Sequence, residues 1–341
     1  MFSHSFKFPR AAMFFLLLVQ CAFKNWSMET TCNVTSNSSD RYFHYINRMS
    51  VDEITGYCNR MLNYAFRVLW MDRRLHHPVY LAIDTTDLPC SANNLEFMHY
   101  GIKKRGTKVH KTKVIRFATM SLVMKDFKLT LAVIPVRKKE KMESYVEKLI
   151  RLIPRGVVVR CILMDKGFYH SGVMKTVERY GLKYLIPVKR YREMDMRYHI
   201  AEITNRWRFP YTMNANTDKA YTFNVYLQDI GVEYYVGFAS NLDMTGKDFF
   251  TLVQAYKYRW NIEVGYKEGL EYRIKTRTRP HGHRVIAFMI SHILMNIQSI
   301  ITKENPSDEL TIYYMKEFVF PSLLKLRHGT RPMGKRFILV Y

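Results

Sequence analysis

Acidic residues are scarce in this sequence. Its 341 residues include 29 Asp and Glu against 53 Lys and Arg, which gives a formal net charge of +24 at pH 7. A surplus of this size exceeds what solubility requires and indicates a polyanionic partner, with nucleic acid first and an anionic membrane surface second. A basic surface that serves only solubility stays open as the alternative.

Cysteine is also scarce, and its spacing excludes two classes of protein. The five cysteines, at positions 21, 32, 58, 90 and 161, form no Cys-x-x-Cys pair. A zinc ribbon and a disulfide scaffold are therefore unsupported, and we expect reduced, mostly buried thiols. Repeats and low-complexity tracts are absent too, and 48% of the residues are hydrophobic. This composition predicts a globular chain of about two domains, or of one domain with an insertion.

The first thirty residues contain an apolar run that is too short to span a membrane. This run, from Met13 to Phe23, follows Lys7 and Arg10 and so imitates a signal peptide, but no clear small-residue cleavage site follows. We interpret the segment as an amphipathic or poorly ordered leader, with Met28 as an alternative start. The resulting expectation is a cytoplasmic protein without a membrane partner.

Strands and helices alternate through the middle of the chain. Short apolar runs and alternating patterns predict strands over 79–83, 114–124, 129–136, 157–164 and 184–188. Helical spacing predicts helices over 51–74, 142–153, 171–180, 246–270 and 285–301. The two strands on either side of Lys125-Asp126 form a predicted hairpin, and residues 101–113 are interpreted as a basic connection. This order predicts an α/β fold with a mixed sheet.

Two buried strands each end in an aspartate, Asp84 and Asp165, and a later helix carries Glu263 among aromatic residues. Ligands gather at the carboxyl ends of strands in α/β sheets, and hard cations such as Mg²⁺ prefer oxygen ligands. The three carboxylates would suit a metal site. An aspartate after a strand is also a common turn or cap residue, so the spacing alone leaves both interpretations open.

The helix around Glu263 places charged side chains on its apolar stripe. At 100° per residue, one face carries Tyr256, Arg259, Trp260, Glu263, Lys267 and Leu270. Charges on such a stripe cost free energy unless they are paired or used. The pattern therefore favours either an Arg259–Glu263 ion pair at the core edge or a functional site.

Three blocks of the sequence resemble DDE transposases of insertion sequences, the mobile-element enzymes with a β-insertion before the last acid. The blocks are AIDTTD at 82–87, LMDKGFY at 163–169 and YKYRWNIE at 256–263. The resemblance covers roughly residues 76–300. It implies a ribonuclease-H-like mixed sheet flanked by helices, with Asp84, Asp165 and Glu263 as the catalytic and metal-binding acids. Asp87 is the alternative first acid.

The third block is the most specific of the three. The family pattern is tyrosine, two residues, arginine, three residues, glutamate, six residues and lysine, and Tyr256, Arg259 and Glu263 meet it. The last position is Leu270 instead of lysine. We expect Lys267, one turn nearer and on the same face, to reach the same phosphate.

The resemblance also implies a reaction, a cofactor and partners. Two Mg²⁺ ions, with Mn²⁺ as a substitute, would support DNA strand cleavage by water and then strand transfer by the freed 3′-hydroxyl. The partners would be double-stranded DNA, both element ends and target, with a dimer forming on the DNA. The residues expected to contact phosphate are Tyr256, Arg259, Lys267, Lys103, Lys104, Arg105, Lys111, Arg273 and Lys275.

The same reasoning divides the chain into four parts. These are a leader and helical segment over 1–75, a ribonuclease-H-like catalytic domain over 76–188 and 246–305, a β-rich insertion over 189–245 and a tail over 306–341. Two other functions stay open: a DNA-binding derivative that no longer cuts, and a metal-dependent nuclease that cuts without joining. The missing lysine and the lack of a convincing helix-turn-helix before Asp84 keep the first of these in consideration.

Overall fold

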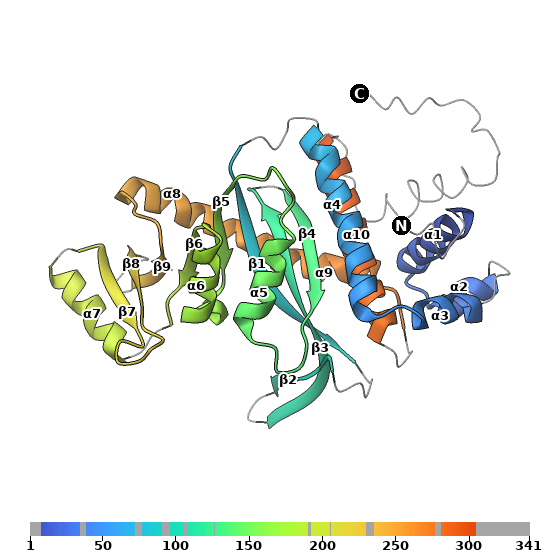
Figure 1. The fold of residues 1–341 in the computed structure, drawn as a ribbon, viewed down its shortest axis with the longest axis horizontal. Helices are drawn as coiled ribbons and strands as arrows, with labels where there is room; N and C mark the ends of the chain where they lie inside the picture. The colour runs from blue at the N-terminus through green and yellow to red at the C-terminus, as the bar shows by residue number, and fades with distance from the viewer. Residues whose placement is uncertain are drawn as a thin grey trace.

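A nine-stranded mixed sheet forms the centre of the structure, a computed structural model, with helices against both of its faces (Figure 1). The structure describes residues 8–34, 39–71, 77–90, 96–105, 108–125, 127–189, 192–204, 206–229, 235–276 and 281–304. The strands are β1 Val79–Pro89, β2 Met98–Arg105, β3 Lys108–Val123, β4 Lys128–Pro135, β5 Val159–Met164, β6 Tyr184–Pro187, β7 Arg208–Met213, β8 Tyr221–Asp229 and β9 Tyr235–Ser240.

The strand order is β2-β3-β1-β5-β6-β9-β8-β7, and β4 also pairs with β3. Strands β1, β5 and β6 run parallel, whereas the pairs on either side of them are antiparallel. The predicted hairpin is present as β3 and β4, which are antiparallel. This mixed sheet confirms the α/β class and is consistent with the ribonuclease-H-like fold that the resemblance implies.

Helices cover the sheet in two layers. Their bounds are α1 Phe8–Lys24, α2 Met28–Val34, α3 Ser39–Asn47, α4 Val51–Met71, α5 Met142–Arg151, α6 Ser171–Arg179, α7 Arg192–Ile203, α8 Gly246–Tyr256, α9 Trp260–Gly269 and α10 His281–Glu304, with short 3₁₀ helices η1 Lys166–Phe168, η2 Lys257–Arg259 and η3 Leu270–Tyr272. Helices α5 and α6 pack on the face that carries Ile83, and α8 and α9 pack on the face that carries Ala82. The two faces of β1 therefore have different environments.

The β-rich segment after residue 188 continues the central sheet. Strand β9 pairs with β6 through Leu185↔Ser240 and Ile186↔Ala239, and β8 and β7 follow outward from it. This β character agrees with the β-rich insertion that the sequence predicted over 189–245. The sequence did not predict the pairing with β6, because the alternation of a strand does not specify its neighbour.

Residues 101–113 do not form the connection that the sequence analysis expected. Residues 101–105 and 108–113 belong to a long ribbon of β2 and β3, which pair from Met98↔Ile115 to Arg105↔Lys108. In its described part, Lys111 and Lys113 are exposed while Val114 is buried. This alternation is the period of a strand, and the charge of the lysines concealed it.

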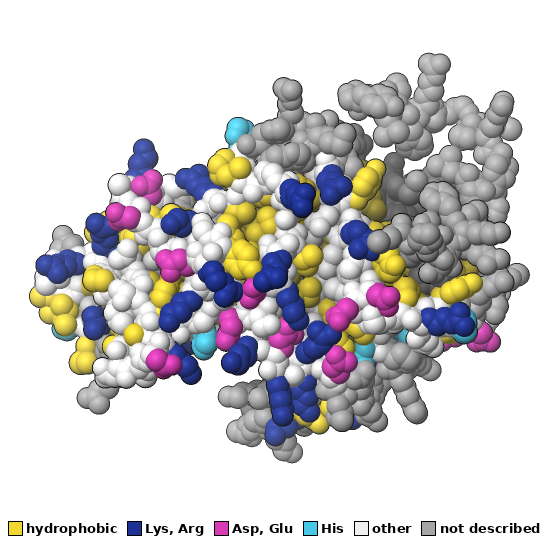
Figure 2. Space-filling model, viewed as in Figure 1, with side chains coloured by type: hydrophobic (Ala, Val, Ile, Leu, Met, Phe, Trp, Pro, Cys, Tyr) yellow, Lys and Arg dark blue, Asp and Glu magenta, His cyan; other side chains and the backbone are white. Residues whose placement is uncertain are grey.

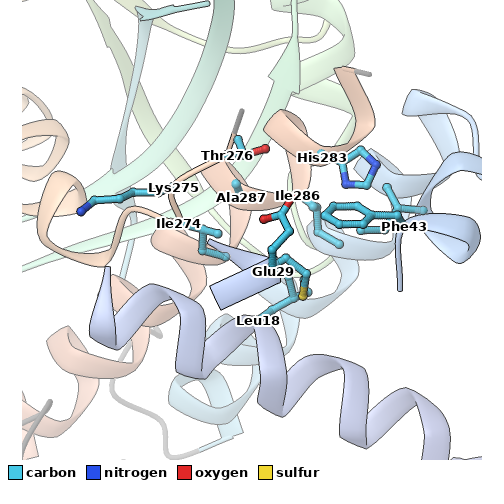
Figure 3. Close-up of a pocket in the computed structure, with 11 residues that line it drawn as sticks. Leu18, Glu29, Phe43, Ile274, Lys275, Thr276, His283, Ile286 and Ala287 are labelled. Atoms are coloured by element: carbon cyan, nitrogen blue, oxygen red, sulfur yellow. The ribbon is translucent and has the colours of Figure 1, made fainter. Parts of the chain in front are cut away.

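Of the two alternatives for the leader, amphipathic or poorly ordered, the second does not describe residues 8–34, which include helices α1 and α2. Helix α1 buries Leu17, Leu18 and Phe23 in one cluster with α10, and the Phe23 ring meets the Tyr272 ring edge to face at 5.6 Å. Figure 3 shows Leu18, with residues of α2, α3 and α10, around a small cavity. The apolar run near the start of the chain is therefore part of a packed core.

Helix α10 is, in the described part of the chain, the one helix with the length and apolar composition of a membrane span, from His281 to Thr302. Within the protein, 61% of its apolar stretch is buried. Its Phe288 ring stacks on Phe117 of β3 at 4.1 Å between centroids. The buried core helix of a soluble protein can have the same length and apolar composition, so these two properties are weak evidence for a membrane span.

Candidate active site

The parallel pairing of β1 and β5 brings the first two predicted acids to one edge. The ladder ends at Ile83↔Met164, so Asp84 and Asp165 are the next residues on neighbouring strands. The sequence predicted that strand β1 ends at Asp84, and the structure differs on this point. The strand continues to Pro89 because its other neighbour, β3, pairs with it as far as Pro89↔Val114.

Asp165 is held by the turn that follows β5. Its Oδ1 accepts a hydrogen bond of 2.8 Å from the Gly167 backbone N–H and so caps η1. A Cβ atom on Gly167 would lie 2.9 Å from that oxygen, which is closer than such contacts occur. Glycine at 167 therefore lets the chain turn close to the carboxylate and orient it.

Asp87, the alternative first acid, lies on the other face of β1. Alternate residues of a strand point to opposite sides, so Asp84 shares the side of Ala82 and Asp87 that of Ile83. The Asp87 carboxylate accepts two hydrogen bonds from the Arg116 guanidinium, at 2.8 and 2.9 Å. These contacts favour Asp84 as the first acid of the site.

Arg259 of η2 bridges Asp84 and Glu263. Its Nη1 donates to Asp84 Oδ2 at 3.3 Å, and its Nη2 donates to Glu263 Oε1 at 3.0 Å. The guanidinium is nearly enclosed, with a side chain that is 12% exposed against 36% for Glu263. The predicted Arg259–Glu263 ion pair is therefore present, and the same cation also holds the first acid.

The Asp84 carboxyl is buried among like charges. It is 7% exposed, and this burial raises its pKa to about 6. The hydrogen bond from Thr85 and the charge of Arg259 oppose that rise, whereas the charges of Asp165 and Glu263 add to it. The charges of the other two predicted acids therefore act on Asp84.

Tyr256 and Tyr266 fix the helical segment that carries Glu263. The Tyr256 hydroxyl donates to the Met164 carbonyl at 3.2 Å, and burial raises the pKa of Tyr256 to about 12. The Tyr266 hydroxyl lies 2.6 Å from the Thr119 hydroxyl of β3. No motif pointed to Tyr266, although its spacing of three residues from Glu263 places it on the same helical face.

The donor set has the chemistry that a divalent cation needs. Three carboxylates offer hard oxygen ligands, and a cation beside Asp84 would offset the burial of its carboxylate, the main cause of its raised pKa, and the repulsion from the other two acids. In the described part of the chain, no three His, Cys, Asp or Glu side chains close around one position. The Arg259 guanidinium lies between Asp84 and Glu263, and its Nε is buried without a hydrogen-bond partner. The residues fit a cation chemically once Arg259 turns away.

The structure describes the side chains of some of the other residues that were predicted to contact phosphate. Lys111 is exposed on the β2–β3 ribbon, and Arg273 and Lys275 are exposed after η3. The Lys275 backbone N–H donates to the Trp26 carbonyl at 3.3 Å, which ties this segment to the N-terminal helices. The side chains of Lys103, Lys104, Arg105 and Lys267 lie outside the described residues.

The comparison with protein families agrees with this geometry. Residues 76–297 match a family model described as the transposase DDE domain. The matched range begins just before β1 and ends within α10. No curated protein matches the chain.

Proposed function

Because the chain belongs to the transposase DDE domain family, we propose that it cuts DNA and joins the cut strand to a target by metal-dependent phosphoryl transfer. Members of this family act on DNA and generally use divalent metal ions. The proposal assigns the cation-binding role to Asp84, Asp165 and Glu263. Two ions of Mg²⁺, or Mn²⁺ in their place, would be held by these carboxylates.

The three acidic side chains would hold the cations, and the protein positions each of them in a different way. Bound divalent cations supply activation of the attacking oxygen and stabilisation of the leaving oxygen in an in-line displacement. A hydrogen bond from the Gly167 N–H orients the Asp165 carboxylate. Helix α9 positions Glu263, and the contact between the Tyr266 and Thr119 hydroxyls holds that helix against the sheet. Asp84 contributes an enclosed carboxylate from which water is largely excluded.

Arg259 has two tasks in this proposal. Without DNA, its guanidinium balances Asp84 and Glu263 and keeps the acids together. With cations and DNA present, it leaves the carboxylates and faces a phosphate, for which its planar fork is suited. Its buried Nε, which has no partner in the present arrangement, then gains one.

The substrate would be double-stranded DNA, both the ends of a mobile element and the target. Two ends must be paired for transposition, so we propose a dimer that forms on the DNA. The protein would act in the cytoplasm, where it meets the chromosome. The net charge of +24 supports a polyanionic substrate of this kind.

One observation supports the proposal above all: Asp84 and Asp165 directly follow the last paired residues of two neighbouring parallel strands, and Arg259 joins the buried Asp84 carboxylate to Glu263. Burying the Asp84 carboxylate beside two further acidic residues costs free energy unless a partner or a ligand compensates for it. An ordinary structural ion pair would need one acid and not three.

The test is cleavage of a plasmid that carries the gene with its flanking DNA. With Mg²⁺ or Mn²⁺, the wild-type protein should cut at the element ends and join the freed ends to target DNA. Asp165→Asn should abolish both products while DNA binding persists, and Asp87→Asn, the matched control, should cut normally. Binding without any cutting by the wild type would identify an inactive derivative, and cutting without joining would identify a nuclease.

A further inference from the structure

A cleft with a volume of about 540 Å³ opens directly beside the candidate active site. It lies between the second half of β1 and the segment formed by α9, η3 and α10. Its walls include Thr86, Tyr266, Leu270, Arg273, Arg284 and Ser291. The cleft is within the size range of pockets that hold small organic ligands, and it is larger than a single ion requires.

The cleft is lined by further residues of β1 and α9, the two elements that carry Asp84 and Glu263. Thr86 follows Asp84 on the same face of β1, about 7 Å further along the strand. Tyr266 follows Glu263 by one turn of α9. A DNA strand with one phosphate at the acids would therefore have a neighbouring part of its backbone at the cleft.

The charge of the cleft wall is positive. Two guanidinium groups line it, from Arg273 after η3 and from Arg284 of α10. Among the described lining residues, Asp87 is the one acidic residue, and its carboxylate lies on the other face of β1, where Arg116 engages it. Arg284 is 5% exposed, and burial together with the nearby Arg273 charge lowers its pKa. An anion in the cleft would offset both effects.

The cleft also contains the position at which the family pattern is broken. Leu270 stands where the pattern has lysine, it lines the cleft, and its side chain is 54% exposed. A lysine there would point a cation toward the same space. In this chain, Arg273 and Arg284 supply positive charge to that space instead.

We propose that Arg273 and Arg284 bind a backbone phosphate of DNA in this cleft and replace the lysine that is missing at position 270. The inference rests on the proposed function, and it names the residues that position the strand next to the acids. The phosphate could come from DNA, from a free nucleotide or from inorganic phosphate. The continuity of the cleft with the acidic edge identifies DNA as the source.

The experiment measures DNA affinity against salt concentration with the full chain in EDTA. A fluorescent DNA duplex of arbitrary sequence is the probe, and each lost phosphate contact lowers the slope of log K against log salt by about 0.9. Arg284→Gln and Arg273→Gln should each show this loss, and Arg284→Lys should not. Leu270→Lys, added to Arg284→Gln, should restore the slope.

Arg179→Gln is the matched control, because Arg179 is an exposed arginine on α6 at the other face of the sheet. Its slope should equal that of the wild type. An equal loss in Arg179→Gln, or no loss in Arg273→Gln, would overturn the assignment even if Arg284→Gln fails to fold.

Two competition experiments distinguish a DNA phosphate from a free phosphate-containing ligand. Inorganic phosphate and a deoxynucleoside monophosphate, each compared with chloride at equal ionic strength, should displace no additional DNA from the wild type. Displacement that is specific to either anion and lost in Arg284→Gln would assign the cleft to a free ligand and overturn the proposal. The assay contains no divalent cation, so its failure is distinguishable from a failure to cut the plasmid.

Discussion

Asp84 shows the conflict between stability and function at the scale of one residue. The chain buries a carboxylate beside two others and offsets them with the single cation of Arg259. The pKa of about 6 means that the folded protein holds a proton on Asp84 more tightly than the unfolded chain, whose carboxyl has an ordinary pKa of 3.8. Stability from this group is therefore present at low pH and is lost as the pH rises through 6.

Asp84→Asn should stabilise the folded protein above pH 6. The asparagine mimics the protonated carboxyl, so the gain in the free energy of unfolding at pH 7.5 is expected to approach about 3 kcal/mol and to vanish near pH 4. Urea unfolding at several pH values measures it. A variant that is less stable than the wild type at pH 7.5 would contradict the buried, charged state of Asp84.

The sequence proposed candidate residues for the site, and it could not predict their environment. The three blocks pointed to Asp84, Asp165 and Glu263, but they did not separate Asp84 from Asp87. The separation depends on which face of β1 meets α9, and that is a property of packing. The bridge from Arg259 to Asp84 spans 175 residues and has no local sequence signal.

At the scale of elements, helices and strands with a regular hydrophobic period were predicted well, and segments whose period is interrupted were not. Helices α5 and α6 and strands β5 and β6 match the expected ranges to within a few residues. The continuous helix expected over 246–270 is instead α8, η2 and α9, because a 3₁₀ turn at Lys257–Arg259 interrupts the 100° rotation. That turn directs Arg259 toward the acids while Trp260 is 58% exposed.

The packing of helix α1 into the core was not expected from the sequence, and its burial gives a prediction. Leu18→Ala should lower the free energy of unfolding by about 2–5 kcal/mol, because Leu18 is 3% exposed in the cluster with α10. Val34→Ala on α2, where the side chain is 62% exposed, is the control and should change little. Thermal unfolding compares them, and equal effects of the two would indicate that α1 does not pack on the core.

At the scale of the whole molecule, charge decides the class of partner. Figure 2 shows Lys and Arg side chains spread across the face that carries α5 and α6, with acidic side chains among them. Several of these cations are paired, such as Lys148 with Glu140 and Arg151 with Glu147. The basic excess therefore acts through the summed field, which steers DNA to the molecule without reading its sequence.

DNA affinity should fall steeply with salt. With about 6 to 10 phosphate contacts, the association constant is expected to drop on the order of a thousandfold or more between 50 and 200 mM salt. Fluorescence anisotropy with a duplex of arbitrary sequence measures the drop. An affinity that is insensitive to salt would show that the surplus of cations does not contact the DNA backbone.

Composition predicted the kind of partner, and the blocks predicted the family, since both are encoded in residue types and short spacings. The cleft beside the acids was beyond such reasoning. Arg284 stands at the start of an apolar helix, where a lone arginine looks like a solvent-exposed end. Only the three-dimensional arrangement, with α10 beside η3, shows that it is buried near Arg273.

The most direct test of the account is Mn²⁺ binding, followed by electron paramagnetic resonance of the free ion. The wild type should bind Mn²⁺, Asp84→Asn, Asp165→Asn and Glu263→Gln should each weaken binding by at least about tenfold, and Asp87→Asn should match the wild type. Undiminished binding in the three acid variants, or an equal loss in Asp87→Asn, would contradict the claim that Asp84, Asp165 and Glu263 share one cation site.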